Sequence, residues 1–290
     1  MTRPECIRLF DVGGTALKCA LGIPGAGPVA GSFGSFPMPS GGSREQIAGA
    51  FASASAFLSG KAEKLGYEIC GTAAAVPGPF DYANGVFLMK HKFASVYGES
   101  FASLGIGGEC RFVHDVNGAL RGELAACGNA SGNVALVTLG TGLGFAYSVD
   151  GVVQKAPGGS PAQILYNRPF RDGILEDYVS RRGIIAAYDK LSGGNSGLDV
   201  VDIAALASKG NAAALKAFEQ LGEALGEGVA PVLSRLGIRE LILGGQISKS
   251  YDLFEAALRS SLPEGVAVRV SDDIAGAVMR GAAALYSNQH

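Results

Sequence analysis

The amino-acid sequence predicts an α/β protein of two similar lobes around a central cleft, and two observations lead to this fold class. The chain has 290 residues, 48% of them apolar, which suits two lobes better than one compact core of ordinary size. The order of strand, glycine turn and returning strand also occurs twice, near residues 7–21 and near 133–149. A repeat of this length predicts two copies of one structural unit.

The first copy opens with an apolar strand at residues 7–11, a turn at Gly13-Gly14 and a second strand at 16–21. Two glycines between apolar runs are a strong signal of a hairpin. Ser43 suits the N-cap of a long helix. The remaining elements of this copy are expected to be a strand at 29–36, a helix from 43 to about 64, and a strand at 68–76 that runs into the turn 77–79.

The second copy repeats this order. Its strands are expected at 133–139, 145–149, 152–154 and 241–243, with a glycine turn at 140–144. Helices are expected at 203–226, 229–236, 251–258 and 275–286, the last one packing on the first lobe. Between the copies, a strand at 111–113 precedes a helix that starts near Asn117. These positions divide the chain into a first lobe of 1–116 plus 274–290 and a second lobe of 117–273.

Composition excludes several classes of function. The formal net charge of -2 and the 17% of charged residues give no basic surface for nucleic acid or an anionic membrane. No secretory signal and no apolar stretch of about 18 residues is apparent, so we expect a cytoplasmic protein. The five cysteines are widely spaced and form no CxxC or Cys/His cluster, which is typical of reduced thiols and not of a structural zinc site.

Two glycine turns could hold an anion through their backbone amides. In DVGGT at 11–15, the carboxylate could hold hydrated Mg²⁺ while the turn amides and the threonine hydroxyl contact phosphate. LGTGLG at 139–144 offers the same groups, and neither turn has the pattern of a P-loop or of a Rossmann site. Each could be an ordinary hairpin turn. Their matching positions in the two copies favour phosphate binding.

Two further motifs have both a chemical and a structural interpretation. Asp115, in HDVNGA at 114–119, could be a general base that accepts a proton from an alcohol, or the N-cap of the following helix. Asn117 could equally be the cap, which would leave Asp115 free. In LGGQIS at 243–248, the glycines could let an adenine base lie flat on the backbone, or could simply form a strand-to-helix turn.

Together these motifs resemble the ROK family of the sugar-kinase and actin-like ATPase superfamily, over nearly the whole chain. The resemblance is carried by DVGGT at 11–15, VPGPFDYANGV at 76–86, HDVNGALRGE at 114–123, LGTGLG at 139–144 and LGGQIS at 243–248. It implies two actin-like, ribonuclease H-like lobes with duplicated βββαβα units and an ATP-dependent kinase that phosphorylates a hexose or N-acetylhexosamine. The first lobe would contact sugar and phosphate, and the second would bind the nucleotide and form a homodimer.

The resemblance also assigns roles to residues. Asp115 would be the catalytic base and Asp11 would hold Mg²⁺ through water. The residues that would contact ATP are Gly13, Gly14, Thr15, Gly140, Thr141, Gly142, Gly244 and Gly245. The residues that would line the sugar pocket are Pro77, Gly78, His91, His114, Asp115, Gln163 and Tyr166. Glycine amides, Mg²⁺ and one base suffice for phosphoryl transfer, because the protein mainly positions the reactants and neutralises charge.

The chain departs from the family pattern around the sugar. Many members carry a GExGH segment and a cysteine-rich zinc loop, whereas here Gln163 and Tyr166 replace the Glu and the His, no cysteine follows, and zinc is not expected. His114 stands where Asn usually precedes the catalytic Asp. Because buried polar groups reject substrates that leave them unpaired, the substrate need not be glucose.

Two other functions are compatible with the resemblance. Some relatives are repressors with an N-terminal helix-turn-helix, but only ten residues precede Asp11, so DNA binding is not expected. A sugar-binding protein without catalytic activity is the other alternative, because the pocket residues are altered. The presence of Asp115 and of both glycine turns favours the kinase.

Overall fold

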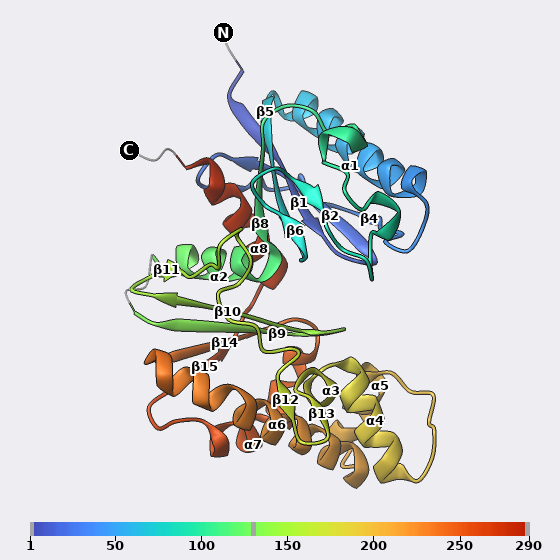
Figure 1. The fold of residues 1–290 in the computed structure, drawn as a ribbon, viewed down its shortest axis with the longest axis vertical. Coiled ribbons are helices and arrows are strands. Elements are labelled where there is room, and N and C mark those ends of the chain that lie inside the picture. The colour runs from blue at the N-terminus through green and yellow to red at the C-terminus, as the bar shows by residue number, and fades with distance from the viewer. Residues whose placement is uncertain (1–2, 129–131, 288–290) are drawn as a thin grey trace. The chain divides into compact units, whose positions relative to one another are not determined.

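The computed structural model describes residues 3–128 and 132–287 and divides the chain into two compact units. The first contains the described residues within 1–130, 153–162 and 273–290, and the second those within 131–152 and 163–272. Each unit contains a mixed β-sheet with helices packed on it (Figure 1). The predicted α/β class is confirmed.

The first unit follows the predicted order of elements closely. Its strands are β1 (Glu5–Val12), β2 (Ala16–Ile23), β3 (Gly27–Pro28), β4 (Gly34–Pro37), β5 (Glu68–Val76), β6 (Phe80–Asp81), β7 (Val86–Phe87) and β8 (Cys110–His114). Its helices are α1 (Arg44–Leu65), α2 (Asp115–Ala126) and α8 (Ile274–Ala283), with 3-10 helices η1 (Ala94–Val96), η2 (Ala102–Leu104) and η4 (Ala284–Tyr286). Ser43 is the N-cap of α1, as predicted, and forms a reciprocal capping box with Gln46.

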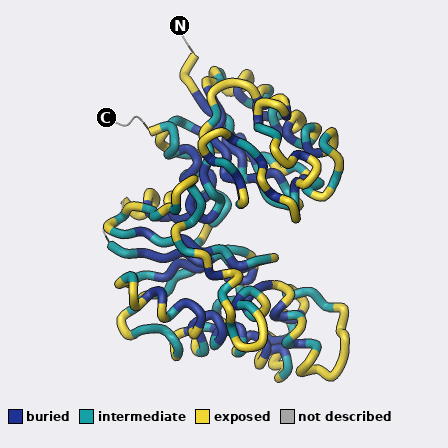
Figure 2. Tube along the Cα trace, viewed as in Figure 1, coloured by how far each residue is buried: buried dark blue, intermediate teal, exposed yellow. Residues whose placement is uncertain are grey.

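The main sheet of this unit has the order β3-β2-β1-β5-β8, with β4 also paired to β2. Alternate residues of β1 face opposite sides of the sheet, and both sides are buried. On one side Phe10 packs edge-to-face on Phe51 of α1, at 5.9 Å between ring centroids. On the other side α2 and α8 cover the strands. Figure 2 shows that the buried residues run along these strands.

The second unit contains the other copy. Its strands are β9 (Val134–Leu139), β10 (Leu143–Val149), β11 (Val152–Val153), β12 (Pro169–Phe170), β13 (Gly173–Ile174), β14 (Glu240–Gly244) and β15 (Ala267–Val270). Its helices are α3 (Glu176–Val179), α4 (Arg181–Ser192), α5 (Val200–Ser208), α6 (Ala212–Leu236) and α7 (Glu255–Ser261), with the 3-10 helix η3 (Ile247–Leu253). Strand β11 lies at the boundary of the two units.

The two main sheets confirm the predicted duplication. In the first, β1 pairs antiparallel with β2 and parallel with β5, and β5 continues in parallel to β8. In the second, β9 pairs antiparallel with β10 and parallel with β14, and β14 continues in parallel to β15. The glycine turns lie at corresponding places, directly after β1 and directly after β9.

Several predicted elements are wrong in their bounds. The strand expected at 29–36 is interrupted, because the buried Ser32 hydroxyl bonds Leu21 of β2 and Val29 where a continuous strand would pair. Helices were expected at 203–226 and 229–236, but the break lies instead between α5, which ends at Ser208, and α6, whose N-cap is Asn211. Glycines near 226–228 do not end α6. A Cβ on Gly228 would lie 2.5 Å from Leu175, so this glycine permits close packing.

Helix α2 starts earlier than predicted and belongs to the first unit. It begins at Asp115, with His114 as the N-cap, so neither Asp115 nor Asn117 is the cap. A Cβ on Gly122 of α2 would lie 1.8 Å from the carbonyl oxygen of Ala277 in α8, so only glycine allows this helix contact. The predicted lobe boundary after residue 116 had assigned most of this helix to the second lobe. The assignment of sugar binding to the first lobe and of nucleotide binding to the second stays a prediction.

Candidate active site

The side chain of Asp115 lies at the first turn of α2, directly after β8. Its Oδ1 accepts a hydrogen bond from the backbone N–H of Val116 at 2.7 Å and lies 2.7 Å from Nδ1 of His114. Its Oδ2 has no hydrogen-bond partner among the described residues. The side chain is 41% exposed. One carboxylate oxygen is therefore fixed by the protein, and the other is available to a ligand.

The surroundings of Asp115 favour its ionised form. Burial acts to raise the pKa of this carboxyl, but the charge and hydrogen bond of His114, the amide of Val116 and the charge of Lys92 outweigh it, so the pKa is lowered. Nδ1 of His114 lies 3.4 Å from the Val116 nitrogen and only 2.7 Å from Oδ1. The shorter contact puts the proton on Nδ1, which donates to Asp115. Nε2 of the imidazole lies toward Gly78, 3.4 Å from where a Cβ on that glycine would stand.

Asp11 is a second carboxylate near Asp115. It faces Lys18 across the antiparallel pair β1–β2, with 3.2 Å between Lys18 Nζ and Asp11 Oδ2. Burial raises the pKa of Asp11, while the Lys18 charge lowers it and the Asp115 charge raises it. The two carboxylates therefore lie within electrostatic range of each other. Of the two carboxylates, Asp11 is the one whose ionised form needs a nearby cation to stabilise it.

The turn after β1 has two amides available to a ligand. The Gly13 N–H donates to the Ala16 carbonyl at 3.0 Å and closes the hairpin. The amides of Gly14 and Thr15 have no backbone partner among the described residues. Gly13 thus has a structural role in the turn, and the next two residues offer the predicted anion contacts.

Lys92 lies across this turn, which the sequence did not predict. Its Cδ and Cε are each 3.4 Å from where a Cβ on Gly14 would stand, and the Ser40 hydroxyl donates to the Gly14 carbonyl at 2.6 Å. The run Lys-His-Lys at 90–92 indicated His91 as a candidate, but His91 is exposed and has no polar contact among the described residues. The lysine next to it reaches the site instead.

Small residues and Tyr82 line the side of the site near His114. Pro77 and Gly78 follow β5, and the Gly78–Pro79 peptide bond is cis. The buried Tyr82 donates to the carbonyl of Val76 at 2.9 Å, and its ring centroid lies 5.9 Å from that of His114. This side of the site thus combines an imidazole, a phenol ring and bare backbone.

Asn117 connects α2 to the loop before Gln163. Its Nδ2 donates to the carbonyl of Gly159 at 3.3 Å, and its buried Oδ1 has no hydrogen-bond partner in the described part of the chain. A Cβ on Gly159 would lie 3.0 Å from Tyr82, so this loop packs closely on the wall that Tyr82 forms.

The second glycine turn is built like the first. The Gly140 N–H bonds the Gly142 carbonyl at 3.1 Å, which leaves the amides of Thr141 and Gly142 without a backbone partner among the described residues. The next amide, of Leu143, donates to Oε2 of Glu176 at 2.8 Å. Glu176 is paired in turn with Arg182 at 3.0 Å. Glu176 therefore holds the backbone at Leu143, where the turn leads into β10. The sequence did not indicate this role, because Glu176 is distant from the turn in the chain.

Gly244 is the last residue of β14 and Gly245 follows it, so the strand runs into the two glycines as predicted. Gly245 has φ +92°, and a Cβ there would lie 2.2 Å from the carbonyl oxygen of Leu139. This glycine is required by the packing of two strand ends. Its predicted contact with adenosine stays a prediction.

Gln163 and Tyr166 lie in the second unit. Oε1 of Gln163 accepts from Arg235 at 2.7 Å, and Tyr166 is 45% exposed. Gln163 also lines a surface hollow of about 490 Å³ with Arg168, Pro231 and their neighbours. Their predicted contacts with a sugar stay predictions.

The Asp11 carboxylate suits a hydrated Mg²⁺, which needs only one or two protein carboxylates when nucleotide phosphates supply the rest. Burial and the nearby charge of Asp115 disfavour the ionised form of Asp11, which a divalent cation would stabilise. The described residues hold no cluster of three or more His, Cys, Asp or Glu side chains able to bind a metal ion alone. None of the described helices has the length and apolar character needed to cross a membrane.

Known proteins place this geometry in context. The family model described as ROK family matches residues 11–288. No curated protein sequence gives a significant match. The fold is similar to a ROK family glucokinase from Streptomyces griseus in complex with glucose and AMPPNP, with a TM-score of 0.78 and 20% identity over 97% of this chain and 99% of that one.

Two other structures are also similar. A ROK hexokinase from Thermus thermophilus has a TM-score of 0.74 and 21% identity over 97% of each chain. A ROK family transcriptional regulator, a homologue of the E. coli MLC protein, has a TM-score of 0.75 and 17% identity over 97% of this chain and 78% of that one. These likenesses show a common fold, which confirms the predicted actin-like lobes. Because the family model covers almost the entire sequence, the chain belongs to the ROK family.

Proposed function

We propose that this protein transfers the γ-phosphoryl group of ATP to a hydroxyl group of a hexose or N-acetylhexosamine. The observation that carries the proposal is the state of Asp115, whose pKa is lowered and whose Oδ2 has no hydrogen-bond partner within residues 3–128 and 132–287. This carboxylate lies within electrostatic range of the DVGGT turn, which offers two backbone amides. Membership of the ROK family and the fold shared with a glucokinase and a hexokinase support the same reaction.

In this reaction Asp115 acts as the general base. Its Oδ2 accepts the proton of the acceptor hydroxyl, and the hydroxyl oxygen forms a bond to the γ-phosphorus. The bond between that phosphorus and the β,γ-bridging oxygen breaks, and ADP leaves with the electron pair. The hydrogen bonds to Oδ1 from His114 and Val116 hold the carboxylate so that Oδ2 is directed at the acceptor.

The nucleotide would be held by backbone and by one cation site. The amides of Gly14, Thr15, Thr141 and Gly142 would contact phosphate oxygens, and Gly244 and Gly245 would lie against the adenosine. Asp11 would hold Mg²⁺ through water, and the ion would neutralise charge on the β- and γ-phosphates. We expect a homodimer and a cytoplasmic location, as the family resemblance and the composition indicate.

The acceptor pocket has its own hydrogen-bonding demands. The Nε2 atom of His114, when Nδ1 carries the proton, is an acceptor beside Gly78. An Asn at that position would instead offer an amide. We therefore expect a sugar that presents a hydroxyl or amide donor to Nε2, with Pro77, Gly78 and Tyr82 against its ring.

A sugar-binding regulator without catalytic activity is the second candidate. The observation in its favour is the shared fold with a ROK family transcriptional regulator. The two candidates differ in turnover and not in sugar binding.

The test is an assay of ADP release with Mg-ATP across a panel of hexoses, N-acetylhexosamines and their epimers. A kinase shows at least one sugar that stimulates ADP release well above the rate without sugar. If a sugar binds in calorimetry but none stimulates ADP release, the regulator is supported and the kinase is rejected.

A further inference from the structure

We propose that Lys92 is a catalytic residue whose ammonium group contacts the phosphoryl group as it passes from the nucleotide to the acceptor. The inference rests on the proposed kinase function and adds a cation to the predicted machinery of glycine amides, Mg²⁺ and one carboxylate. Three features of the first unit lead to it: where the side chain lies, what its charge faces, and how its loop is held.

The position of the side chain connects the phosphate turn to the base. The stem of Lys92 crosses Gly14, with Cδ and Cε 3.4 Å from where a Cβ on that residue would stand. Burial raises the pKa of Asp115, and the charge of Lys92 is one of the interactions that lower it. The side chain therefore extends from the turn that would hold phosphate toward the carboxylate that would hold the acceptor. A phosphoryl group in transfer follows the same path.

The ammonium group of Lys92 forms no ion pair in the part of the chain that the structure describes. Among the described residues, no carboxylate lies within ion-pair distance of its ammonium group. The other lysine of the site, Lys18, is already paired with Asp11 at 3.2 Å. An ammonium group held beside bare amides and left unpaired is suited to an anionic ligand, because phosphate oxygens would then supply its missing acceptors.

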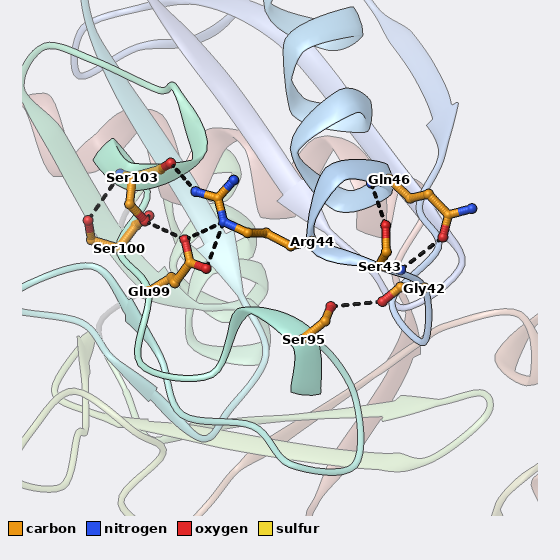
Figure 3. Close-up of polar contacts among 8 residues, drawn as sticks. All are labelled: Gly42, Ser43, Arg44, Gln46, Ser95, Glu99, Ser100 and Ser103. Atoms are coloured by element: carbon orange, nitrogen blue, oxygen red, sulfur yellow. Dashed lines mark hydrogen bonds and ion pairs between the residues drawn. The ribbon is translucent and has the colours of Figure 1, made fainter.

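The loop that carries Lys92 is fixed by the residues that follow the lysine. The Phe93 N–H donates to the Ser40 carbonyl at 2.7 Å. The Ser95 hydroxyl donates to the Gly42 carbonyl at 2.7 Å (Figure 3). Farther along, Arg44 of α1 binds both carboxylate oxygens of Glu99, at 2.8 and 3.0 Å (Figure 3). These contacts tie the loop to the segment before α1, which also holds Gly14 through Ser40.

Phe93 itself stores local backbone strain. It has φ 55°, in the left-handed region that is unfavourable for a residue with a side chain. Its ring is completely buried and lies 5.3 Å from that of Phe87. Aromatic packing therefore holds an unfavourable backbone conformation, and that conformation places the preceding lysine on the phosphate turn. Strain of this kind is characteristic of functional sites.

The chemical benefit is charge neutralisation. Charge in phosphoryl transfer is spread over the equatorial oxygens of the phosphoryl group, and a fixed ammonium beside them stabilises the transition state without reorganisation. Lys92 is within range of Asp115 and would also favour the ionised base before proton transfer. By comparison with the loss of one preorganised donor, removing its charge is expected to lower kcat by about 10²–10³-fold.

The experiment replaces the charge and keeps the stem, as in Lys92→Met. Its matched control is Lys90→Met, since Lys90 lies in the same loop but packs over the ring of Tyr97 at 5.3 Å. We expect Lys92→Met to lose about 10²-fold in kcat, with little change in the KM of the sugar, and Lys90→Met to match the wild type. Lys92→Arg retains the charge and should recover part of the loss. Thermal melting of each variant checks folding.

A second measurement does not depend on turnover. Calorimetry with AMPPNP and with ADP, both with Mg²⁺, gives the preference for a nucleotide that carries a γ-phosphoryl group. Lys92→Met should lower that preference, and Lys90→Met should leave it unchanged. A folded Lys92→Met enzyme with near-native kcat overturns the proposal. If the wild type phosphorylates no sugar, the proposed kinase function is rejected, but the role of Lys92 is still tested by the nucleotide preference. An unchanged preference for AMPPNP over ADP in Lys92→Met would reject a contact between Lys92 and the γ-phosphoryl group.

Discussion

Asp115→Asn separates the chemical role of this residue from its structural one. The amide oxygen of Asn can still accept from the Val116 N–H at the position of Oδ1, 2.7 Å away, and still lies beside His114. The side chain is 41% exposed, so the substitution creates no cavity. We expect the free energy of unfolding to change by no more than about 0.5 kcal/mol, as for other substitutions outside the core.

The same substitution removes the base completely, because an amide cannot accept a proton at neutral pH. Loss of general-base catalysis is worth about 10²–10⁴ in kcat, which corresponds to about 3–5 kcal/mol of activation free energy. ADP release with the best sugar of the panel measures this loss, and calorimetry with sugar and AMPPNP should give nearly unchanged binding constants. We therefore expect a large loss of kcat together with a small change in the free energy of unfolding.

Asp81→Asn is the matched control. Asp81 is in the same unit and accepts hydrogen bonds from the backbone of Ala83 and Asn84, so it has a capping role without a place in the site. It should leave kcat unchanged. An Asp115→Asn enzyme that keeps kcat within about threefold of the wild type would refute the assignment, since no general base contributes so little.

Three further predictions concern the site and its support. His114→Asn keeps a hydrogen-bond donor but removes the imidazole, whose interaction with the carboxylate lowers the pKa of Asp115, so the acidic limb of kcat/KM against pH should move to higher pH. Gly140→Ala adds a methyl group where no atom lies within 4 Å, so stability should persist while the affinity for AMPPNP falls, as calorimetry would measure. Gly122→Ala places a Cβ 1.8 Å from the Ala277 carbonyl oxygen, and the free energy of unfolding in urea should fall by about 1–3 kcal/mol or more.

Gly49→Ala serves as a control for both glycine variants. This exposed position in α1 has no atom within 4 Å of the added Cβ, and alanine there should stabilise the helix by about 0.5–1 kcal/mol. Unchanged nucleotide affinity in Gly140→Ala would mean that this turn is only a hairpin. A stable Gly122→Ala protein would show that α2 and α8 can separate without cost. An acidic limb that stays in place in His114→Asn would remove His114 from control of the base.

Local sequence patterns predicted the strands and both glycine turns because each depends on neighbours in the chain. A strand was predicted at 68–76 because the segment runs into the turn residues at 77–79, and β5 has these bounds. Lys92 was missed because its place depends on the left-handed backbone at Phe93, which only the surrounding aromatic packing selects. Glu176 was missed because its bond to Leu143 joins residues far apart in sequence. A helix end was wrongly predicted near the glycines at 226–228. The sequence alone does not distinguish a glycine that ends a helix from one that allows another element to pack closely against it.

The two carboxylates of the site have different surroundings, which divides their roles. Asp11 has its pKa raised by burial, so its charge requires a cation, and Lys18 supplies one in the protein alone. Asp115 has its pKa lowered in spite of burial, because His114, a backbone amide and Lys92 face it. Environments that separate the pKa values of two neighbouring acids usually indicate separate functions. Asp115 therefore suits proton transfer at Oδ2, whereas Asp11 suits a metal ion. Exchanging their roles would make Asp11 the base, although its Oδ2 is paired with Lys18 and its raised pKa disfavours the ionised form.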